Sequence, residues 1–166
     1  MTTSQNNELF EKVLLGEIEG KNRAIHSYDG IIWRVRVGFL TLLFGGWAIL
    51  LKGIVETSVT EPTQYSKLVL GLVVFSIGFA LGAWIVDRNY VQRKFRVILA
   101  LSALIDESRS HSDNYEKISP GLLKVAGDNG DMPFDSKGYR QAIAVGLVVY
   151  LIPLCTVIAG VFVVSP

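Results

Sequence analysis

Residues 68–86, LVLGLVVFSIGFALGAWIV, form a run without a single charged side chain. An α-helix rises about 1.5 Å per residue, so a run of this length covers about 28 Å, close to the thickness of the hydrocarbon core of a bilayer. Asp87 and a group of basic residues follow the run directly. We therefore expect a transmembrane helix over residues 68–87, and a chain built around such a helix is a membrane protein.

Two other apolar segments match the first in length. Residues 37–55 contain only one charge, Lys52, and residues 141–164 contain none. Half of the whole chain is apolar, more than a soluble domain of this size usually carries. The sequence therefore predicts an all-α, polytopic membrane protein, a single membrane domain over residues 1–166 with transmembrane helices at 31–55, 68–87 and 141–164.

Basic residues gather on one side of the three predicted spans. They precede the first and third spans and follow the second, whereas the loop at 56–67 carries Lys67 against Glu56 and Glu61. Basic loops stay in the cytoplasm, so we expect a cytoplasmic N-terminus, cytoplasmic residues 88–140 and a C-terminus outside. The basic residues on which this orientation rests are Lys21, Arg23, Arg34, Arg36, Arg88, Arg93, Lys94, Arg96, Lys137 and Arg140.

The segments next to the spans predict a cytoplasmic helical layer. Residues 8–28 repeat apolar side chains at intervals of three, four and seven, which indicates an amphipathic helix leading into the membrane. Residues 88–108 continue from the second span without Gly or Pro, with an apolar surface that includes Phe95, Ile98 and Leu99. This surface is too wide to remain solvated, and the N-terminal helix of the same chain or of a neighbouring subunit is its simplest partner.

Residues 109–139 read as a cytoplasmic loop with one short helix at 120–126, because Ser119-Pro120 is a typical helix start. The acidic turn Asp128-Asn129-Gly130-Asp131 lacks the alternating oxygen ligands and the distal Glu of a calcium loop. A plain turn is favoured there.

Small residues recur at helical spacing in the second and third spans. Such residues allow close approach of helix backbones in lipid, where packing and hydrogen bonds replace hydrophobic association. The sequence leaves open whether this packing occurs within one chain or between subunits. The residues are Gly71, Gly78 and Gly82 in the second span and Ala142 and Gly146 in the third.

Charged residues lie at the ends of the first two spans. Arg34 and Arg36 interrupt the apolar entry to the first span, and Asp87 and Arg88 end the second at the matching depth. Charges at this level must pair, snorkel or meet lipid phosphates. We expect Asp87 to pair with Arg34 or Arg36 and the remaining cation to contact anionic headgroups, with independent snorkelling as the alternative. Lys52 is expected to snorkel at the outer end.

Residue types for catalysis are scarce. The two histidines, His26 and His111, have no Cys or second His beside them, and the single cysteine, Cys155, lies in an apolar stretch. The net charge of +1 argues against nucleic-acid binding. The sequence therefore predicts no enzyme, no metal or cofactor and no small-molecule substrate.

The segment HSYDGIIWRVRVGFLTLLFGGW at 26–47, followed by a second span, a basic helix extension and a C-terminal third span, resembles the RipA family of small bacterial inner-membrane proteins. The resemblance implies a protein of the bacterial cytoplasmic (inner) membrane that forms octamers, is tied in some pathogens to growth inside host cells, and has no established biochemical activity.

The chain also resembles SLATT-type effector domains, which pair two membrane helices with cytoplasmic helices and are thought to form pores in bacterial defence. The third span, at 141–164, departs from that layout.

Together these features predict a homo-oligomeric membrane scaffold. An oligomeric channel or pore is the first alternative, although the spans offer few polar residues for a water path: Thr41, Lys52, Ser76 and Thr156. The second alternative is an accessory subunit that uses the apolar face of residues 88–108 to bind a different protein.

Overall fold

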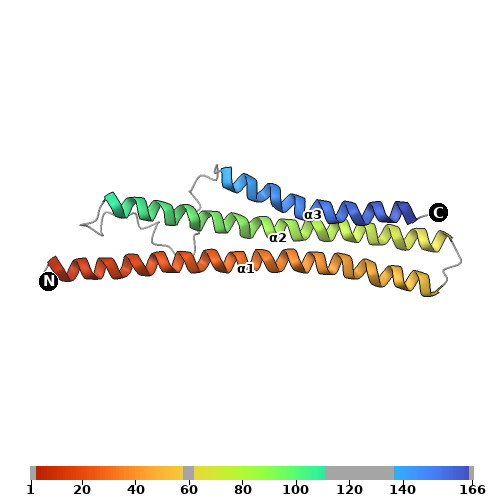
Figure 1. Ribbon diagram of the computed structural model, residues 1–166, viewed down its shortest axis with the longest axis horizontal. Coiled ribbons are helices and arrows are strands. Elements are labelled where there is room, and N and C mark those ends of the chain that lie inside the picture. Colours follow the sequence, from red (N-terminus) through yellow and green to blue (C-terminus); the bar gives the residue numbers. More distant parts are fainter. Residues whose placement is uncertain (1–2, 58–61, 111–136, 165–166) are drawn as a thin grey trace. The chain divides into compact units, whose positions relative to one another are not determined.

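The computed structural model describes residues 3–57, 62–110 and 137–164, and all of these residues are helical (Figure 1). Helix α1 is Thr3–Thr57, α2 is Pro62–Ser110 and α3 is Lys137–Val164. Each contains a stretch long and apolar enough to cross a membrane, within Glu11–Gly53, Ser66–Ser108 and Gly138–Gly160. The all-α prediction with three such helices is confirmed for this part of the chain.

Helix α1 joins two segments that the sequence analysis treated separately, residues 8–28 and 31–55. No proline lies between Thr3 and Thr57, and Gly30 costs only about 1 kcal/mol relative to Ala inside a helix. Contacts of this segment with α2, between Tyr28 and Tyr90 and between Asp29 and Lys94, offset that cost, so the helix continues through Asp29 and Gly30. Helix α2 continues from the second span as predicted, and Pro62 opens it at the position where a missing N–H is harmless.

The short helix predicted at 120–126 and the turn predicted at 128–131 lie outside the described residues, as does His111.

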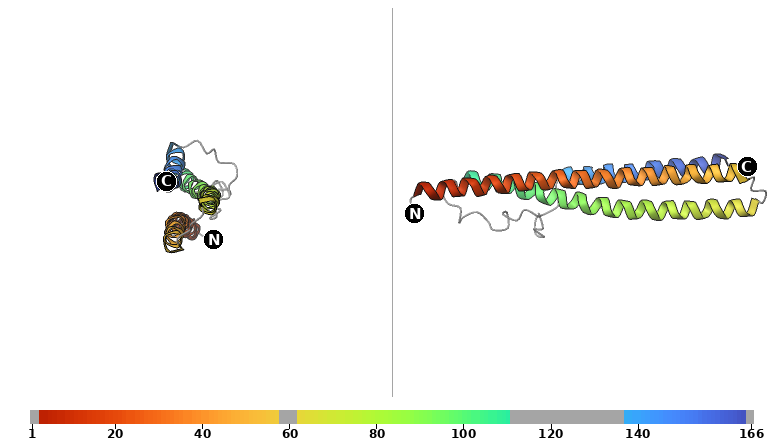
Figure 2. Two further views of the ribbon diagram at one scale, coloured as in Figure 1. Left: turned by 90° about the vertical axis from the view of Figure 1, so that its right-hand side faces the viewer. Right: turned by 90° about the horizontal axis from the view of Figure 1, so that it is seen from below.

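The chain divides into two compact units. The first comprises Met1–Ile31 and Tyr90–Arg140, and the second comprises Ile32–Asn89 and Gln141–Pro166. Helices α1 and α2 each contribute to both units (Figures 1 and 2). The predicted spans are residues 31–55, 68–87 and 141–164. The second unit contains all of these residues except Ile31.

In the first unit, α1 and α2 of the same chain pack against each other. The Tyr28 and Tyr90 rings lie 6.3 Å apart, and Lys94 Nζ donates to Asp29 Oδ1 at 2.6 Å. In the structure the N-terminal helix therefore packs on α2 of its own chain, one of the two partners that the sequence left open.

The side chains of α2 that are fully buried in the first unit are Val97, Ala100 and Leu104, which repeat at intervals of three and four. Phe95, Ile98 and Leu99, which the sequence analysis named for this surface, are only half-buried. The Phe95 ring meets Tyr139, in the first turns of α3, edge to face at 5.7 Å. Phe95 therefore also joins α2 to α3.

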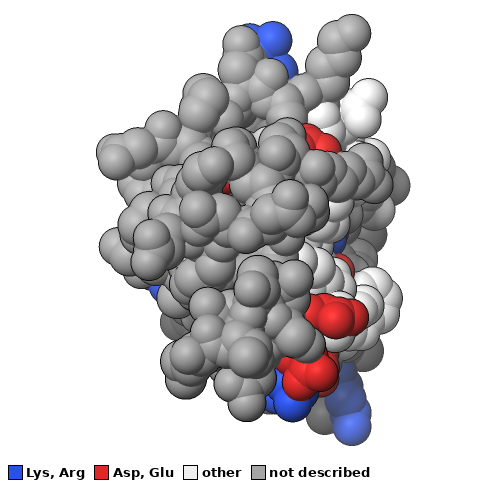
Figure 3. All heavy atoms as spheres, turned by 90° about the vertical axis from the view of Figure 1, so that its left-hand side faces the viewer, with Lys and Arg blue, Asp and Glu red and all other residues white. Residues whose placement is uncertain are grey.

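Charged residues of both signs occur in the first unit. Seen from the end of the molecule at which α1 begins, acidic and basic side chains of the described residues lie beside one another (Figure 3). Glu17 pairs with Lys21 and Glu19 with Arg23, one helical turn apart along α1. The Glu19–Arg23 pair is exposed, and such pairs contribute only a few tenths of a kcal/mol each. The Lys21 side chain, by contrast, is fully buried, and Glu17 is its partner in this buried position.

The second unit is a bundle of three helices around a narrow core. Helices α1 and α2 run antiparallel, and α3 lies alongside α2 (Figures 1 and 2). Phe39 of α1 stands in the core, with its ring centroid 4.8 Å from that of Tyr150 and 5.7 Å from that of Phe79. The buried residues of this core are Phe39, Leu43, Trp47, Ala80, Tyr150 and Leu154.

Most side chains of the apolar stretches face outward. Only 11–17% of the residues in the most apolar window of each helix are buried. Exposed apolar residues at such density would aggregate a soluble protein, whereas lipid tails solvate them without penalty. The surface of the second unit is therefore suited to a bilayer.

Candidate functional site: a buried ion pair among three helices

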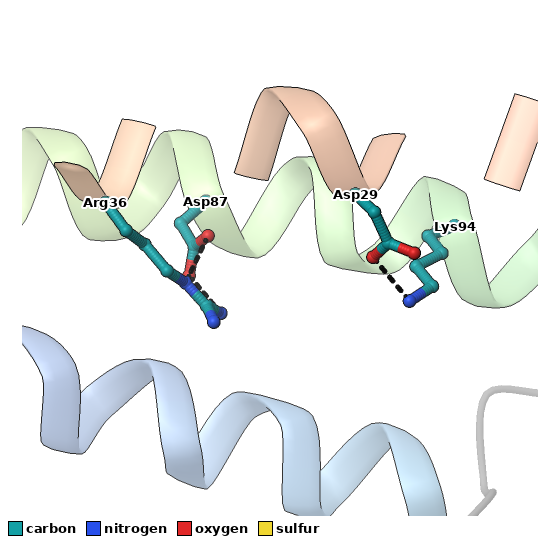
Figure 4. Close-up of polar contacts among 4 residues, drawn as sticks. All are labelled: Asp29, Arg36, Asp87 and Lys94. Carbon is teal, nitrogen blue, oxygen red and sulfur yellow. Dashed lines mark hydrogen bonds and ion pairs between the residues drawn. The ribbon is translucent and has the colours of Figure 1, made fainter. Parts of the chain in front are cut away.

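An ion pair joins α1 to α2 inside the second unit (Figure 4). Arg36 Nε donates to Asp87 Oδ1 at 3.1 Å, and Arg36 Nη2 donates to Asp87 Oδ2 at 3.0 Å. Two parallel N–H to oxygen bonds are the strongest arrangement available to this pair of side chains. Of the two arginines that the sequence left open as partners, the structure pairs Arg36 with Asp87.

The geometry of α1 explains the choice of Arg36 over Arg34. Arg36 lies on the same helical face as the buried residues Phe39 and Leu43, which follow it at intervals of three and seven. Each residue turns the helix by about 100°, so Arg34 lies about 200° away from Arg36 and is exposed. A carboxylate that faces α1 from α2 can therefore meet only Arg36.

Helix α3 closes the pair from the third side. The Asp87 side chain is 2% exposed and that of Arg36 is 21% exposed. Gly146 of α3 is buried against them: a Cβ at this position would lie 3.1 Å from Asp87 Oδ2 and 3.6 Å from Arg36 Nη2. Any side chain there would press on the carboxylate, so the close approach of α3 depends on glycine.

Tyr150 follows Gly146 by one turn and is also buried. Its hydroxyl lies within electrostatic range of both Arg36 and Asp87. Tyr150 was not among the site residues predicted from the sequence. One sequence feature could have identified it: Tyr150 is the single tyrosine in the charge-free segment 141–164. A buried phenol hydroxyl usually has a polar partner, so such a tyrosine indicates a polar group nearby.

A second buried polar contact joins α1 to α2. Trp47 Nε1 donates to Ser76 Oγ at 3.0 Å, and both side chains are buried. The bond satisfies the indole N–H, which has no other way to be solvated in an apolar core. Trp47 therefore packs within the chain.

Replacing Trp47 with Phe should lower the free energy of unfolding, because it leaves the Ser76 hydroxyl without its donor. Double-mutant cycles on such bonds in membrane proteins average about 0.6 kcal/mol and reach about 1.7 kcal/mol. Unfolding by dodecyl sulfate in mixed micelles would measure this coupling from Trp47→Phe, Ser76→Ala and the double variant. Trp33→Phe is the matched control, because Trp33 is 68% exposed. A coupling of zero would show that the bond contributes nothing.

The other predicted site residues lie outside the ion pair. Arg88 is exposed, with its guanidinium carbon 5.6 Å from the centroid of the Trp84 ring, and Lys52 is exposed. Ala142 is half-buried on α3. Gly71, Gly78 and Gly82 are exposed, and no described atom lies within 4 Å of a Cβ built on any of them.

The arrangement holds helices together and offers little for catalysis. Asp87, whose carboxylate is the only one buried among the described side chains, is neutralised by Arg36. Within the described ranges, no three His, Cys, Asp or Glu residues are grouped so that they could hold a metal ion. The absence of catalytic activity stays a prediction from the residue inventory.

No protein-family model, curated protein or solved structure matches this chain. The resemblances to the RipA family and to SLATT-type domains therefore stay predictions.

Proposed function

We propose that this protein is a self-associating, non-catalytic scaffold of a bacterial inner membrane, with its N-terminus in the cytoplasm and its C-terminus outside. The observation that supports self-association most directly is an exposed face of α2 made of Gly71, Gly78 and Gly82, here called the glycine face.

The glycine face is directed away from the rest of the described chain. Its residues are spaced by seven and four, which places them within about 40° of one another around the helix. Ala80 and Asp87, which pack inside the bundle, lie on the opposite side of α2 at about 160–180°. The glycine backbone is therefore bare on the outside of the bundle, where another helix can approach closely.

The contrast with Gly146 strengthens the proposal. Gly146 also belongs to a spacing of small residues, and its small size is used within the chain, against Asp87 and Arg36. No described residue makes such use of Gly78 and Gly82. Contact between copies would give the spacing of the glycine face a physical purpose. The RipA-like layout makes eight the copy number to expect.

The described polar contacts favour a scaffold over a pore. Of the four residues that the sequence offers for a water path, Ser76 accepts a hydrogen bond from Trp47 in the core, and Thr156 Oγ1 donates to the carbonyl oxygen of Ile152 on its own helix. Neither hydroxyl needs water, so these residues provide no reason for a hydrated path.

Replacing both Gly78 and Gly82 with Ile should dissociate the assembly, because two branched side chains would separate the helix backbones at the proposed contact. Mass photometry of the protein in nanodiscs measures the number of copies directly. The double variant should move most particles from a ring of many copies to monomers or dimers, with helix content unchanged by circular dichroism.

Gly45→Ile is the matched control, because Gly45 is equally exposed on α1 and lies outside the glycine face. It should leave the particle mass unchanged. A monomeric wild-type protein, or an intact ring in the double variant, would contradict the proposal. Co-purification of a different protein with monomers would favour the accessory-subunit alternative.

A further inference from the structure

An apolar groove lies between α2 and α3 in the second unit and has a volume of about 200 Å³. Ile77, Leu81 and Trp84 of α2 form one wall, and Leu147, Leu151 and Leu154 of α3 form the other. Four of these side chains are themselves exposed, so the groove opens to the outside of the bundle. In the proposed membrane location, the surrounding medium would be the acyl chains of lipids.

The apolar lining of the groove restricts what can occupy it. A polar ligand would lose its hydrogen bonds to water without finding partners there, whereas a hydrocarbon chain loses nothing. Lipid tails are as apolar as leucine, so the groove alone would not select one lipid over another. Selection requires a polar contact at one end of the groove.

Arg88 supplies a charge at one end. Ile77, Leu81, Trp84 and Arg88 are spaced by four, three and four, and therefore lie on one stripe of α2. The guanidinium carbon of Arg88 lies 5.6 Å from the centroid of the Trp84 ring, a cation–π contact that holds the charge beside the groove. A guanidinium in this position is suited to bind a phosphate oxygen.

The geometry points to a binding site for one anionic phospholipid, with an acyl chain in the α2–α3 groove and the headgroup phosphate at Arg88. The proposal rests on the membrane location proposed above and does not depend on self-association. The groove stripe lies about a third of a turn around α2 from the glycine face, so a lipid and a second copy can be bound together.

Fluorescence quenching by brominated lipids tests the site, because bromine on an acyl chain quenches tryptophan by contact. The Trp33→Phe variant would be placed in phosphatidylcholine vesicles that contain a small fraction of either brominated phosphatidylglycerol or brominated phosphatidylcholine. Trp84 then reports on the groove, while buried Trp47 supplies unquenched emission. We expect brominated phosphatidylglycerol to bind beside Trp84 about fivefold more tightly than brominated phosphatidylcholine. This factor corresponds to the attraction of about 1 kcal/mol between one basic residue and an anionic lipid.

Two charge variants test whether the preference for phosphatidylglycerol over phosphatidylcholine depends on Arg88. Arg88→Gln should reduce it to about one, whereas Arg34→Gln, which removes an equally exposed arginine of α1, should leave it unchanged. Leu151→Phe, which fills the groove, should reduce quenching by both lipids. Equal quenching by the two lipids, or a preference that survives Arg88→Gln, would overturn the site.

The exposed Trp33 separates failure of the site from failure of the membrane location. In a Trp84→Phe variant, lipid brominated near the headgroup end of its chains should quench Trp33 whenever the protein is inserted. Quenching of Trp33 without quenching of Trp84 would mean that protein covers the groove, and it would overturn the lipid site alone. Quenching of neither tryptophan would contradict the membrane location as well.

Discussion

Replacing Asp87 with Asn should lower the free energy of unfolding by about 3 kcal/mol, the largest effect that we expect from a single isosteric change. The amide leaves Arg36 charged in an apolar bundle without its counterion, and removing one partner of a buried pair costs about 3–5 kcal/mol in soluble proteins. Titration with dodecyl sulfate in mixed micelles, followed by circular dichroism, measures the loss.

The double variant Arg36→Gln/Asp87→Asn separates the loss of the pair from the presence of the orphaned charge. Two neutral amides can still form a hydrogen bond of about 1 kcal/mol, and no charge remains to be solvated. We therefore expect the double variant to recover most of the stability that Asp87→Asn loses. A double variant less stable than Asp87→Asn would mean that the cost does not come from an unpaired Arg36.

Replacing Gly146 with Val should destabilise the bundle by about 1–3 kcal/mol, the usual cost of adding volume to a packed interior. The first added carbon would lie 3.1 Å from Asp87 Oδ2, which its bidentate contact with Arg36 holds in place. Either α3 moves away from α2 or the ion pair breaks. The same titration measures the change.

Gly160→Val provides the matched control on α3. Gly160 is exposed, and no described atom lies within 4 Å of its Cβ position, so the same substitution there should change stability by less than about 0.5 kcal/mol. Equal losses at both positions would point to a general effect of valine on α3 and would contradict a specific role for Gly146.

The sequence by itself was sufficient to predict that the chain forms long helices and which stretches of them are apolar. Charge-free runs such as residues 68–86 predict long apolar helices, because length and hydropathy are local properties of the chain. The continuation of α2 past Asp87 was predicted for the same reason, since no Gly or Pro interrupts it before Ser108. The sequence did not predict that residues 8–28 and 31–55 form one continuous helix. Asp29-Gly30 resembles a helix end, but in the structure the helix continues through it.

The partners of individual side chains were decided by tertiary structure. Arg34 and Arg36 are the same type of residue two positions apart, and only the face of α1 that packs on α2 distinguishes them. Gly82 and Gly146 belong to the same spacing pattern, yet only Gly146 meets neighbouring atoms within the described chain. Tyr150 and Phe39 join the site from different helices. These contacts depend on the rotation of each helix about its axis, which is set by the packing of all three together and not by any one segment.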